Sequence, residues 1–326
     1  MDLSLILPLV PAAPEQALPY ARLVAEHGRL HRLWQGQSYG VESSATFSYL
    51  AGAGIRVPVG LSVLVTPLRH PTQAALEARS LAVLSGHSPL VGFGPASRAV
   101  QQRLLGTTYA SPLQATEEFL LRVKQALNQV GPHDVAAPGW HRADYFVENE
   151  PLPFVPAPPT LLGLGVLRTG MARLAGRVAD AAITWLTPAS YLREVLVPVL
   201  EKEAADLGRP RPRVVALVPL AVGRPGRDPL ELAQLSLGGH LDGPHYAAML
   251  RSAGVELAGR DQLGRLRAVV EGGVFGHGTP AELAGQLAAY RAAGVDEVVL
   301  NLRATRDLYG DDATLADLHE LLAAVG

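Results

Sequence analysis

The chain has 326 residues, of which 48% are hydrophobic and 18% are charged, so it can bury a large core and its composition argues against disorder. A formal net charge of −2 excludes the basic surface that nucleic-acid binding requires. There is no cysteine, which excludes disulfides, thiolate catalysis and cysteine-based zinc sites. The ten histidines form no HExxH pair and no tight cluster with carboxylates, so we expect no metal site.

The amino terminus carries no targeting signal that the sequence reveals. Met1–Pro8 lacks the basic segment and the long apolar run of a secretory signal. No run of about 18 apolar residues occurs without a charge or a helix breaker, so we expect no membrane span. These features predict a soluble, cytoplasmic protein.

Short apolar runs alternate with longer segments of helical periodicity, the pattern of strands and helices in a parallel α/β sheet. In the first half, we expect strands at 3–7, 30–35, 57–65 and 89–93, and helices at 14–27, 43–53, 72–85 and 111–129. In the second half, we expect strands at 161–165, 182–185, 213–222 and 295–302, helices at 170–179, 190–207, 279–293 and 315–324, and a helical, glycine-interrupted region at 229–272.

The periodicity fails between residues 130 and 159, where prolines and glycines are frequent. Only Asp144–Val147 suggests a short strand in this stretch. A long irregular segment inside a compact domain is typical of a functional insertion. We therefore expect a single domain over residues 1–326, with an insertion or lid at about 130–159.

Eight strand-like segments are each followed by a helix. Eight such units that close on themselves form a (β/α)8 barrel, and the length suits a barrel with an insertion. An open, doubly wound sheet is the alternative. In a barrel, the carboxyl ends of the strands surround the active site.

The residues at these strand ends are small, hydroxyl-bearing or neutral, apart from one arginine. They are Pro8, Gln35, Thr66, Gly94, Gly165, Thr187, Gly223 and Arg303. Such a rim lacks the paired carboxylates of a glycosidase, and the chain contains neither a GxSxG nucleophile motif nor a Walker motif. The rim suits an anionic cofactor that carries the chemistry itself.

Two glycine-rich segments follow strands. Gly163–Gly170 joins a strand to a helix, where glycine allows close approach of a ligand and the helix N-terminus offers unpaired N–H groups to an anion. Its spacing is not that of the GxGxxG dinucleotide motif. A tight structural turn is the alternative here, and a crowded barrel rim is the alternative for Gly92–Ser97.

Several polar or aromatic residues lie near the second and third strands. Arg69 and His70 follow the third strand, where they either serve a substrate or orient the first turn of the next helix. His31 lies early in the second strand, which indicates a position in the core or at the bottom of a barrel. Trp34 is interpreted as a packing residue, with substrate stacking as the alternative.

Three stretches together resemble the luciferase-like monooxygenase superfamily. Val59–Pro71, followed by Glu77–Gly86, resembles its strand, RHP turn and LSGGR segment. Ala172–Asp180 resembles its ELAGRLADG helix, and Gly278–Glu282 resembles its GTPEE helix start. The resemblance covers nearly the whole chain. It implies a (β/α)8 barrel that binds FMN or the deazaflavin F420 and performs hydride transfer or flavin-based oxygenation.

The resemblance is closer to the F420-dependent branch. It implies that Ser62–Leu64 forms a third-strand bulge, often with a non-prolyl cis peptide bond, that supports the deazaflavin ring. It also implies that Val166–Met171 holds the phosphate and that Arg303 or Arg306 lies near the acidic tail of the cofactor. The implied cofactor-binding residues are Gln37, Ser38, Ser62, Val63, Gly94, Pro95, Gly165, Val166, Thr169, Gly170, Met171 and Trp185.

The sequence departs from well-known F420 enzymes at three places. Gln37 and Ser38 stand where many carry an Asp-His pair. The sugar-phosphate dehydrogenases carry a glutamate at the position of Ser97 and a phosphate-binding lysine at the position of Pro188. Oxidation of a sugar hydroxyl therefore lacks its general base. We instead expect hydride delivery from F420H2 to an activated C=C or C=N bond, with a proton from water, Tyr39 or Ser97.

Finer similarity concerns the substrate. Arg32–Ser38 and Tyr109–Leu113 resemble F420H2-dependent reductases that saturate dehydroalanine or dehydrobutyrine in lanthipeptide precursors. A small molecule or a peptide is thus the expected substrate, and the family implies a homodimer. One alternative is an FMN-dependent monooxygenase of the bacterial luciferase type. The other is a non-catalytic barrel that acts as a binding or partner subunit, in keeping with the missing Asp-His pair.

Overall fold

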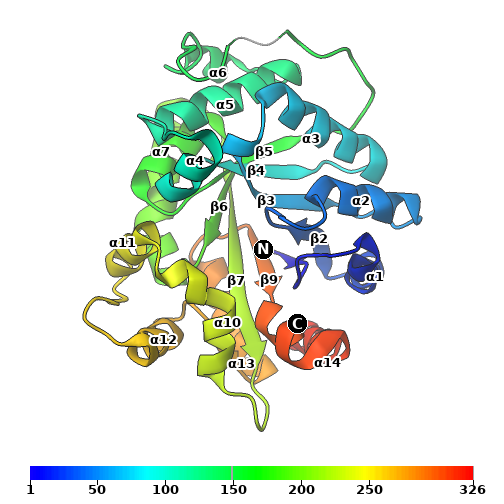
Figure 1. The fold of residues 1–326 in the computed structure, drawn as a ribbon, viewed down its shortest axis with the longest axis vertical. Coiled ribbons are helices and arrows are strands. Elements are labelled where there is room, and N and C mark those ends of the chain that lie inside the picture. Colours follow the sequence, from blue (N-terminus) through cyan, green and yellow to red (C-terminus); the bar gives the residue numbers. More distant parts are fainter. Residues whose placement is uncertain (148–149, 326) are drawn as a thin grey trace.

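The computed structural model describes residues 1–147 and 150–325. Within these residues, eight parallel strands form a closed barrel, because β1 pairs with β9 and β6 pairs with β7 (Figure 1). The strands of the barrel are β1 (Asp2–Ile6), β2 (Leu30–Gln35), β3 (Val59–Val65), β4 (Leu90–Gly94), β5 (Leu161–Gly165), β6 (Ala181–Trp185), β7 (Arg213–Val222) and β9 (Glu297–Asn301). The predicted (β/α)8 barrel is confirmed, and the open sheet is excluded.

One strand lies outside the barrel and was not predicted. The short β8 (Gly276–Gly278) pairs only with the carboxyl end of β7, which extends beyond its neighbours at the rim. A three-residue strand with glycine at both ends has too few apolar side chains to produce a recognisable periodicity.

Helices surround the barrel in Figure 1. They are α1 (Leu18–Glu26), α2 (Ser43–Gly52), α3 (Pro71–Ser85), α4 (Arg98–Leu105), α5 (Pro112–Ala126), α6 (Pro132–Ala136), α7 (Thr169–Val178), α8 (Ala189–Tyr191), α9 (Val197–Asp206), α10 (Pro229–Leu241), α11 (Pro244–Ser252), α12 (Gln262–Glu271), α13 (Pro280–Ala292) and α14 (Arg303–Ala324). The short α4 and α6 were not predicted, and α14 begins twelve residues before the predicted start at 315. Among the described helices, none is long and apolar enough to cross a membrane.

The barrel interior and the layer between the barrel and the helices form two separate hydrophobic clusters. The interior cluster contains Ile6, Trp34, Leu90, Ala181, Ile183, Val215, Leu217 and Val299. Trp34 is fully buried, so its interpretation as a packing residue is confirmed. A Cβ at Gly60 would lie 2.2 Å from the Trp34 ring, so only glycine leaves room for this indole inside the barrel.

The segment between α5 and β5 packs against the outer face of α5. The buried guanidinium of Arg122 donates to the carbonyl oxygens of Trp140 and Arg142, at 3.1 and 2.6 Å. The carboxylate of Glu118, also buried, accepts a hydrogen bond from the backbone N–H of Tyr145. These buried charges hold the described part of this segment, in which α6 is the one regular element, against α5. The lid at about 130–159 stays a prediction.

The expected strand at Asp144–Val147 is absent from the structure, and this prediction was wrong. The N–H groups of Tyr145 and Phe146 point to the Glu118 carboxylate, at 2.9 and 3.4 Å, where a strand would offer them to a neighbouring strand. The Glu118 side chain thus takes the place of a neighbouring strand as the hydrogen-bond acceptor. The local sequence does not reveal this replacement.

Candidate cofactor site

The carboxyl end of β3 carries an irregularity that faces β4 and β5. The β3–β4 register shifts between Leu61 and Leu64, and the Ser62–Val63 peptide bond is cis, as the resemblance implied. The Val63 side chain lies over two glycines, because a Cβ at Gly94 or at Gly165 would approach it to 3.1 or 3.3 Å. Because the two glycines have no side chains, the surface around Val63 carries no protruding group there. Such a surface suits the support of a flat ring.

Several buried polar atoms on β2, β3 and β6 have no hydrogen-bond partner among the described residues. They include the Ser62 Oγ, the Trp185 Nε1 and both amide atoms of Gln35, of which Trp185 and Gln35 end their strands. A buried donor or acceptor without a partner costs about 1–3 kcal/mol, so such groups are expected to pair with a ligand. A flavin or deazaflavin ring has carbonyl oxygens and ring nitrogens that complement a hydroxyl, an indole N–H and an amide.

The N-terminus of α7 follows β5 directly and is open. Its N-cap, Arg168, is extended (φ −140°, ψ 164°) and makes no side-chain cap. The N–H groups of Thr169, Gly170 and Met171 occupy the first turn, where a helix supplies no acceptor. The helix dipole adds partial positive charge at this position. The β5–α7 loop therefore offers an anion-binding site only a few residues beyond Gly165.

Two other helices at this end of the barrel, α4 and α5, are capped by serine side chains. The Ser97 Oγ accepts a hydrogen bond from the N–H of Val100, and the Ser111 Oγ accepts one from that of Gln114. The exposed α7 terminus follows β5, and the ring-supporting surface around Val63 lies at the ends of β3, β4 and β5, which are consecutive in the barrel. The residues present fit a cofactor that combines a planar ring with a phosphate.

The β2–α2 loop is held by internal hydrogen bonds. The Gln37 Oε1 accepts from the backbone N–H of Val65 (3.2 Å) and from Arg69 (2.8 Å), and its Nε2 donates to the Ser38 carbonyl (2.9 Å). The Ser38 Oγ accepts from the N–H of Gly40. Gln37 therefore ties the ends of β2 and β3 together. Direct contact of Gln37 and Ser38 with a cofactor stays a prediction.

Arg69 and His70 have structural partners. The His70 Nδ1 accepts from the N–H of Thr72 and caps α3, which confirms the helix-orienting interpretation. Arg69 forms ion pairs with Glu42 (2.7 Å) and with the largely buried Glu77 (3.3 Å). Burial raises the pKa of Glu77, and the attraction of Arg69 opposes this shift.

The two candidate proton donors are placed differently. Tyr39 is 69% exposed, and Ser97 is half-buried at the start of α4. Next to Ser97, Ala96 adopts a left-handed backbone (φ 61°), and the Pro95 carbonyl accepts a hydrogen bond from Gln101. The roles of Tyr39 and Ser97 as donors, and that of Pro95 at the cofactor, stay predictions.

A group of rings on α10 and α11 lies beside Trp185 at the end of β6. The His240 ring lies 5.6 Å from the Trp185 ring and 5.2 Å from that of Tyr246, and His245 lies 4.3 Å from Tyr246. Burial raises the pKa of Tyr246 to about 12, and burial together with Arg168 lowers the pKa of His245. Sequence reasoning missed these residues, because they follow no strand end. The one hint of them in the sequence was the pair His240 and His245, which lie on either side of Gly243 in the 229–272 region.

Arg303 and Arg306 lie at the start of α14, directly after β9. Their side chains pair with Asp307 (2.5 Å) and Asp311 (3.0 Å). In the barrel order, β6 and β7 separate β9 from β5, whose loop carries the anion site. Contact of either arginine with an acidic cofactor tail stays a prediction.

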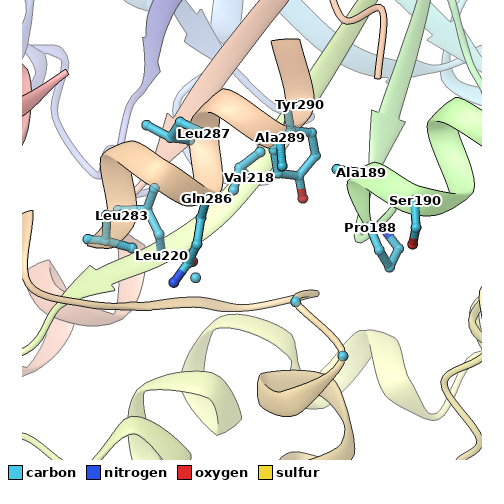
Figure 2. Close-up of a pocket in the computed structure, with 13 residues that line it drawn as sticks. Pro188, Ala189, Ser190, Val218, Leu220, Leu283, Gln286, Leu287, Ala289 and Tyr290 are labelled. Carbon is cyan, nitrogen blue, oxygen red and sulfur yellow. The ribbon is translucent and has the colours of Figure 1, made fainter. Parts of the chain in front are cut away.

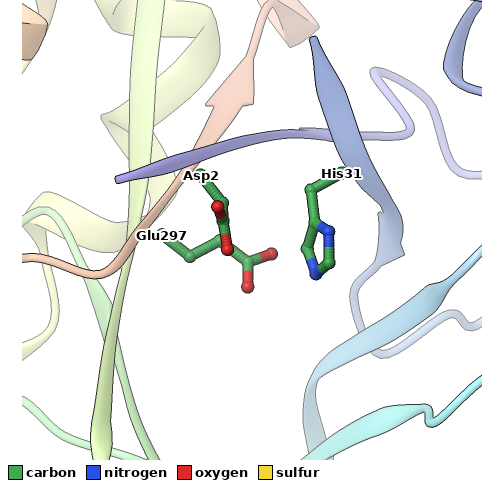
Figure 3. Close-up of side chains that lie close together, drawn as sticks. All are labelled: Asp2, His31 and Glu297. Atoms are coloured by element: carbon green, nitrogen blue, oxygen red, sulfur yellow. The ribbon is translucent and has the colours of Figure 1, made fainter. Parts of the chain in front are cut away.

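The amino-terminal end of the barrel gathers three groups that are able to bind metal. Asp2, His31 and Glu297 place one ligand atom each within 4.8 Å of one another, and Figure 3 shows them pointing toward a common space. Arg213 pairs with Asp2 (2.8 Å), and Arg213 and Arg32 lie 3.6 and 3.5 Å from Glu297. Two guanidinium groups therefore neutralise the two carboxylates, which makes this cluster an ion network. His31 lies at the bottom of the barrel, as predicted; the absence of a metal site stays a prediction.

Comparison with solved structures supports the fold. The chain is similar to the F420-dependent tetrahydromethanopterin reductase of Methanopyrus kandleri, with a TM-score of 0.68 and 18% identity over 97% of this chain and 100% of that one. An F420-dependent secondary alcohol dehydrogenase gives a TM-score of 0.71 at 18% identity, over 100% of this chain and 99% of that one. The EDTA monooxygenase of Chelativorans sp. BNC1 gives 0.71 at 17% identity, over 100% and 93%.

Comparison of sequences gives the family. A protein of Mycobacterium tuberculosis that is named as a coenzyme F420-dependent oxidoreductase is 27% identical over 138 residues, which span 42% of this chain and 40% of that protein. The family model for luciferase-like monooxygenases matches residues 6–297, most of the chain. This chain therefore belongs to the luciferase-like monooxygenase family.

Proposed function

We propose that this chain is an F420H2-dependent oxidoreductase that reduces an activated C=C or C=N bond. The observation that carries the proposal is the presence of both an uncapped α7 N-terminus after β5 and the ring-supporting surface around Val63 at the ends of β3, β4 and β5. Family membership supports a flavin or deazaflavin at this position. The F420-dependent relative and the two F420-dependent structural neighbours favour the deazaflavin.

Each part of the site has a task in this proposal. The N–H groups of Thr169, Gly170 and Met171 hold the phosphate, and Val63 supports the ring from below. The unpartnered Trp185 Nε1 donates to the ring or to the substrate. Reduced F420 supplies a hydride when it is bound. The matching proton comes from water or from a side chain at the mouth, where Tyr39, Ser97 and His240 are the candidates.

The finer proposal concerns the substrate. The strand ends named from the sequence carry no carboxylate to act as a general base in the oxidation of a hydroxyl group. An acceptor that is already electron-poor needs no such base. We propose dehydroalanine or dehydrobutyrine in a peptide, or a small molecule with a comparable double bond, as substrate, and a homodimer as the working form.

Binding of the two cofactors tests the proposal most directly. The purified protein is titrated with F420 and, separately, with FMN at fixed salt, and fluorescence quenching gives both dissociation constants. We expect F420 to bind tightly and FMN weakly, and F420H2 to be oxidised on addition of a dehydroalanine peptide. Preference for FMN with oxygen consumption would point to a monooxygenase. Binding of neither would leave the partner-subunit alternative and overturn the proposal.

Substitution of Thr169 by proline tests the phosphate site. Proline is tolerated at the first helical position, and the extended Arg168 before it already has the backbone that proline demands. The Thr169→Pro variant should therefore fold normally and lose one N–H donor. We expect F420 to bind about tenfold to a hundredfold more weakly, the effect of one lost hydrogen bond to a charged group.

The control for this substitution is Thr169→Ala, which keeps the N–H and removes only the side-chain hydroxyl and methyl groups. Its affinity for F420 should stay close to that of the unaltered protein. Circular dichroism and the midpoint of thermal unfolding verify that both variants fold. A folded Thr169→Pro variant with unchanged F420 affinity would show that the phosphate binds elsewhere.

A further inference from the structure

A hollow of about 220 Å³ lies outside the barrel, between β7, α8 and α13 (Figure 2). Side chains of α13 form one side of it, and the Pro188–Ser190 turn faces them from the other side. Its lining residues are Pro188, Ala189, Ser190, Val218, Leu220, Gly272, Gly273, Gly276, Leu283, Gln286, Leu287, Ala289 and Tyr290. None of these residues is charged, so the hollow does not complement an ionic ligand group.

The backbone of β7 separates this hollow from the cofactor site. Val215 and Leu217 belong to the cluster inside the barrel. Side chains alternate along a strand, so Val218 and Leu220 point outward, and both belong to the outer cluster. A molecule in the hollow would therefore touch neither the surface around Val63 nor the α7 N-terminus.

Two of the polar side chains around the hollow donate hydrogen bonds to backbone carbonyls. The hydroxyl of Tyr290 donates to the Thr187 carbonyl at 3.2 Å, and the amide of Gln286 donates to the His277 carbonyl at 3.0 Å. Ser190 is exposed and lies at the edge of the space. The mostly apolar walls offer few polar partners to the water that fills this partly open hollow, so that water is weakly held. Displacing weakly held water from such a space favours an apolar ligand.

We propose that this hollow binds a small uncharged apolar molecule, either an aromatic ring or an alkyl chain of about six to eight carbon atoms. An enclosed apolar protein cavity of about 150 Å³ is large enough to bind benzene; this hollow has a larger volume and opens to solvent beside Ser190, Gln286 and Ala289. Each methylene that enters the hollow strengthens binding about fourfold. A hydroxyl or other polar end of the ligand remains beside Ser190, where water is available.

Titration with simple probes tests the site without cofactor or substrate. Benzene and n-hexanol are followed by isothermal titration calorimetry and by shifts of methyl resonances, and 1,6-hexanediol serves as a probe of equal length with two polar ends. We expect saturable binding of benzene and n-hexanol, and binding of 1,6-hexanediol at least about tenfold weaker. Absence of saturable binding of both apolar probes up to their solubility would overturn the proposal.

Substitutions that fill the hollow from either side test whether the probe binds in it. Ala189→Leu and Ala289→Leu each add apolar volume at its wall, whereas Ala288→Leu changes the neighbouring exposed residue of α13, which does not line it. We expect the two wall variants to weaken n-hexanol binding about tenfold or more, and Ala288→Leu to leave it unchanged. Equal binding by all three folded variants would place the probe elsewhere and overturn the proposal. The affinity for F420 should be the same in all three.

Discussion

Replacing Glu297 by glutamine should lower the free energy of unfolding by about 3–5 kcal/mol, the cost of breaking a buried ion pair. Glu297 is fully buried, and its Oε1 accepts hydrogen bonds from Ser4 (2.7 Å) and from the Trp34 indole (2.8 Å). The same oxygen lies 3.5 Å from the buried Arg32. The neutral amide of glutamine would leave that guanidinium without a compensating charge. Its NH2 group, a hydrogen-bond donor, would also lie among side chains that are themselves donors.

Chemical denaturation with urea measures this loss. Asp2→Asn is the matched control, because Asp2 is about half-exposed and pairs with the exposed side of Arg213, so its loss should cost less than about 1 kcal/mol. Similar destabilisation by both variants would mean that burial of Glu297 contributes little. Unaltered stability of Glu297→Gln would show that the network at the bottom of the barrel is dispensable.

Replacing Gly94 by valine should weaken F420 binding by about a hundredfold, the upper end of the ~1–3 kcal/mol cost of extra groups in a packed space. A Cβ at Gly94 would already lie 3.1 Å from Val63, so the added methyl groups must displace Val63 or occupy the space above it. Gly165→Ala, with its Cβ 3.3 Å from Val63, should give a smaller loss. Fluorescence titration measures both.

Gly28→Val is the control for this series. Gly28 lies in the turn before β2, at the opposite end of the barrel, and a Cβ there would meet nothing within 4 Å. Its F420 affinity should be unchanged, and the thermal midpoints of all variants establish that each is folded. A folded Gly94→Val variant with unaltered F420 affinity would show that the ring does not lie over Val63, while the phosphate site at α7 would remain open to its own test.

The strands were predictable because their signal is local. The boundaries of β2, β5 and β7 agree with the sequence prediction to the residue. Most residues of β5 and β7 are apolar, which makes these two strands the clearest of the three to recognise. The prediction failed where a segment depends on distant partners. Asp144–Val147 has the composition of a strand but takes its hydrogen-bond acceptor from Glu118, and β8 exists only because β7 extends past the rim.

The order of strands and helices, the barrel, and the glycines and open helix start after β5 can be predicted from the sequence, because these features follow from residues that are close in the chain. The groups that are buried together become known from the folded structure alone. Glu297 meets Trp34 across 263 residues, and His240 meets Trp185 from the last turn of α10, far along the chain from the end of β7. Such contacts depend on how the barrel closes and how the outer helices pack, and no local pattern of polarity encodes that geometry.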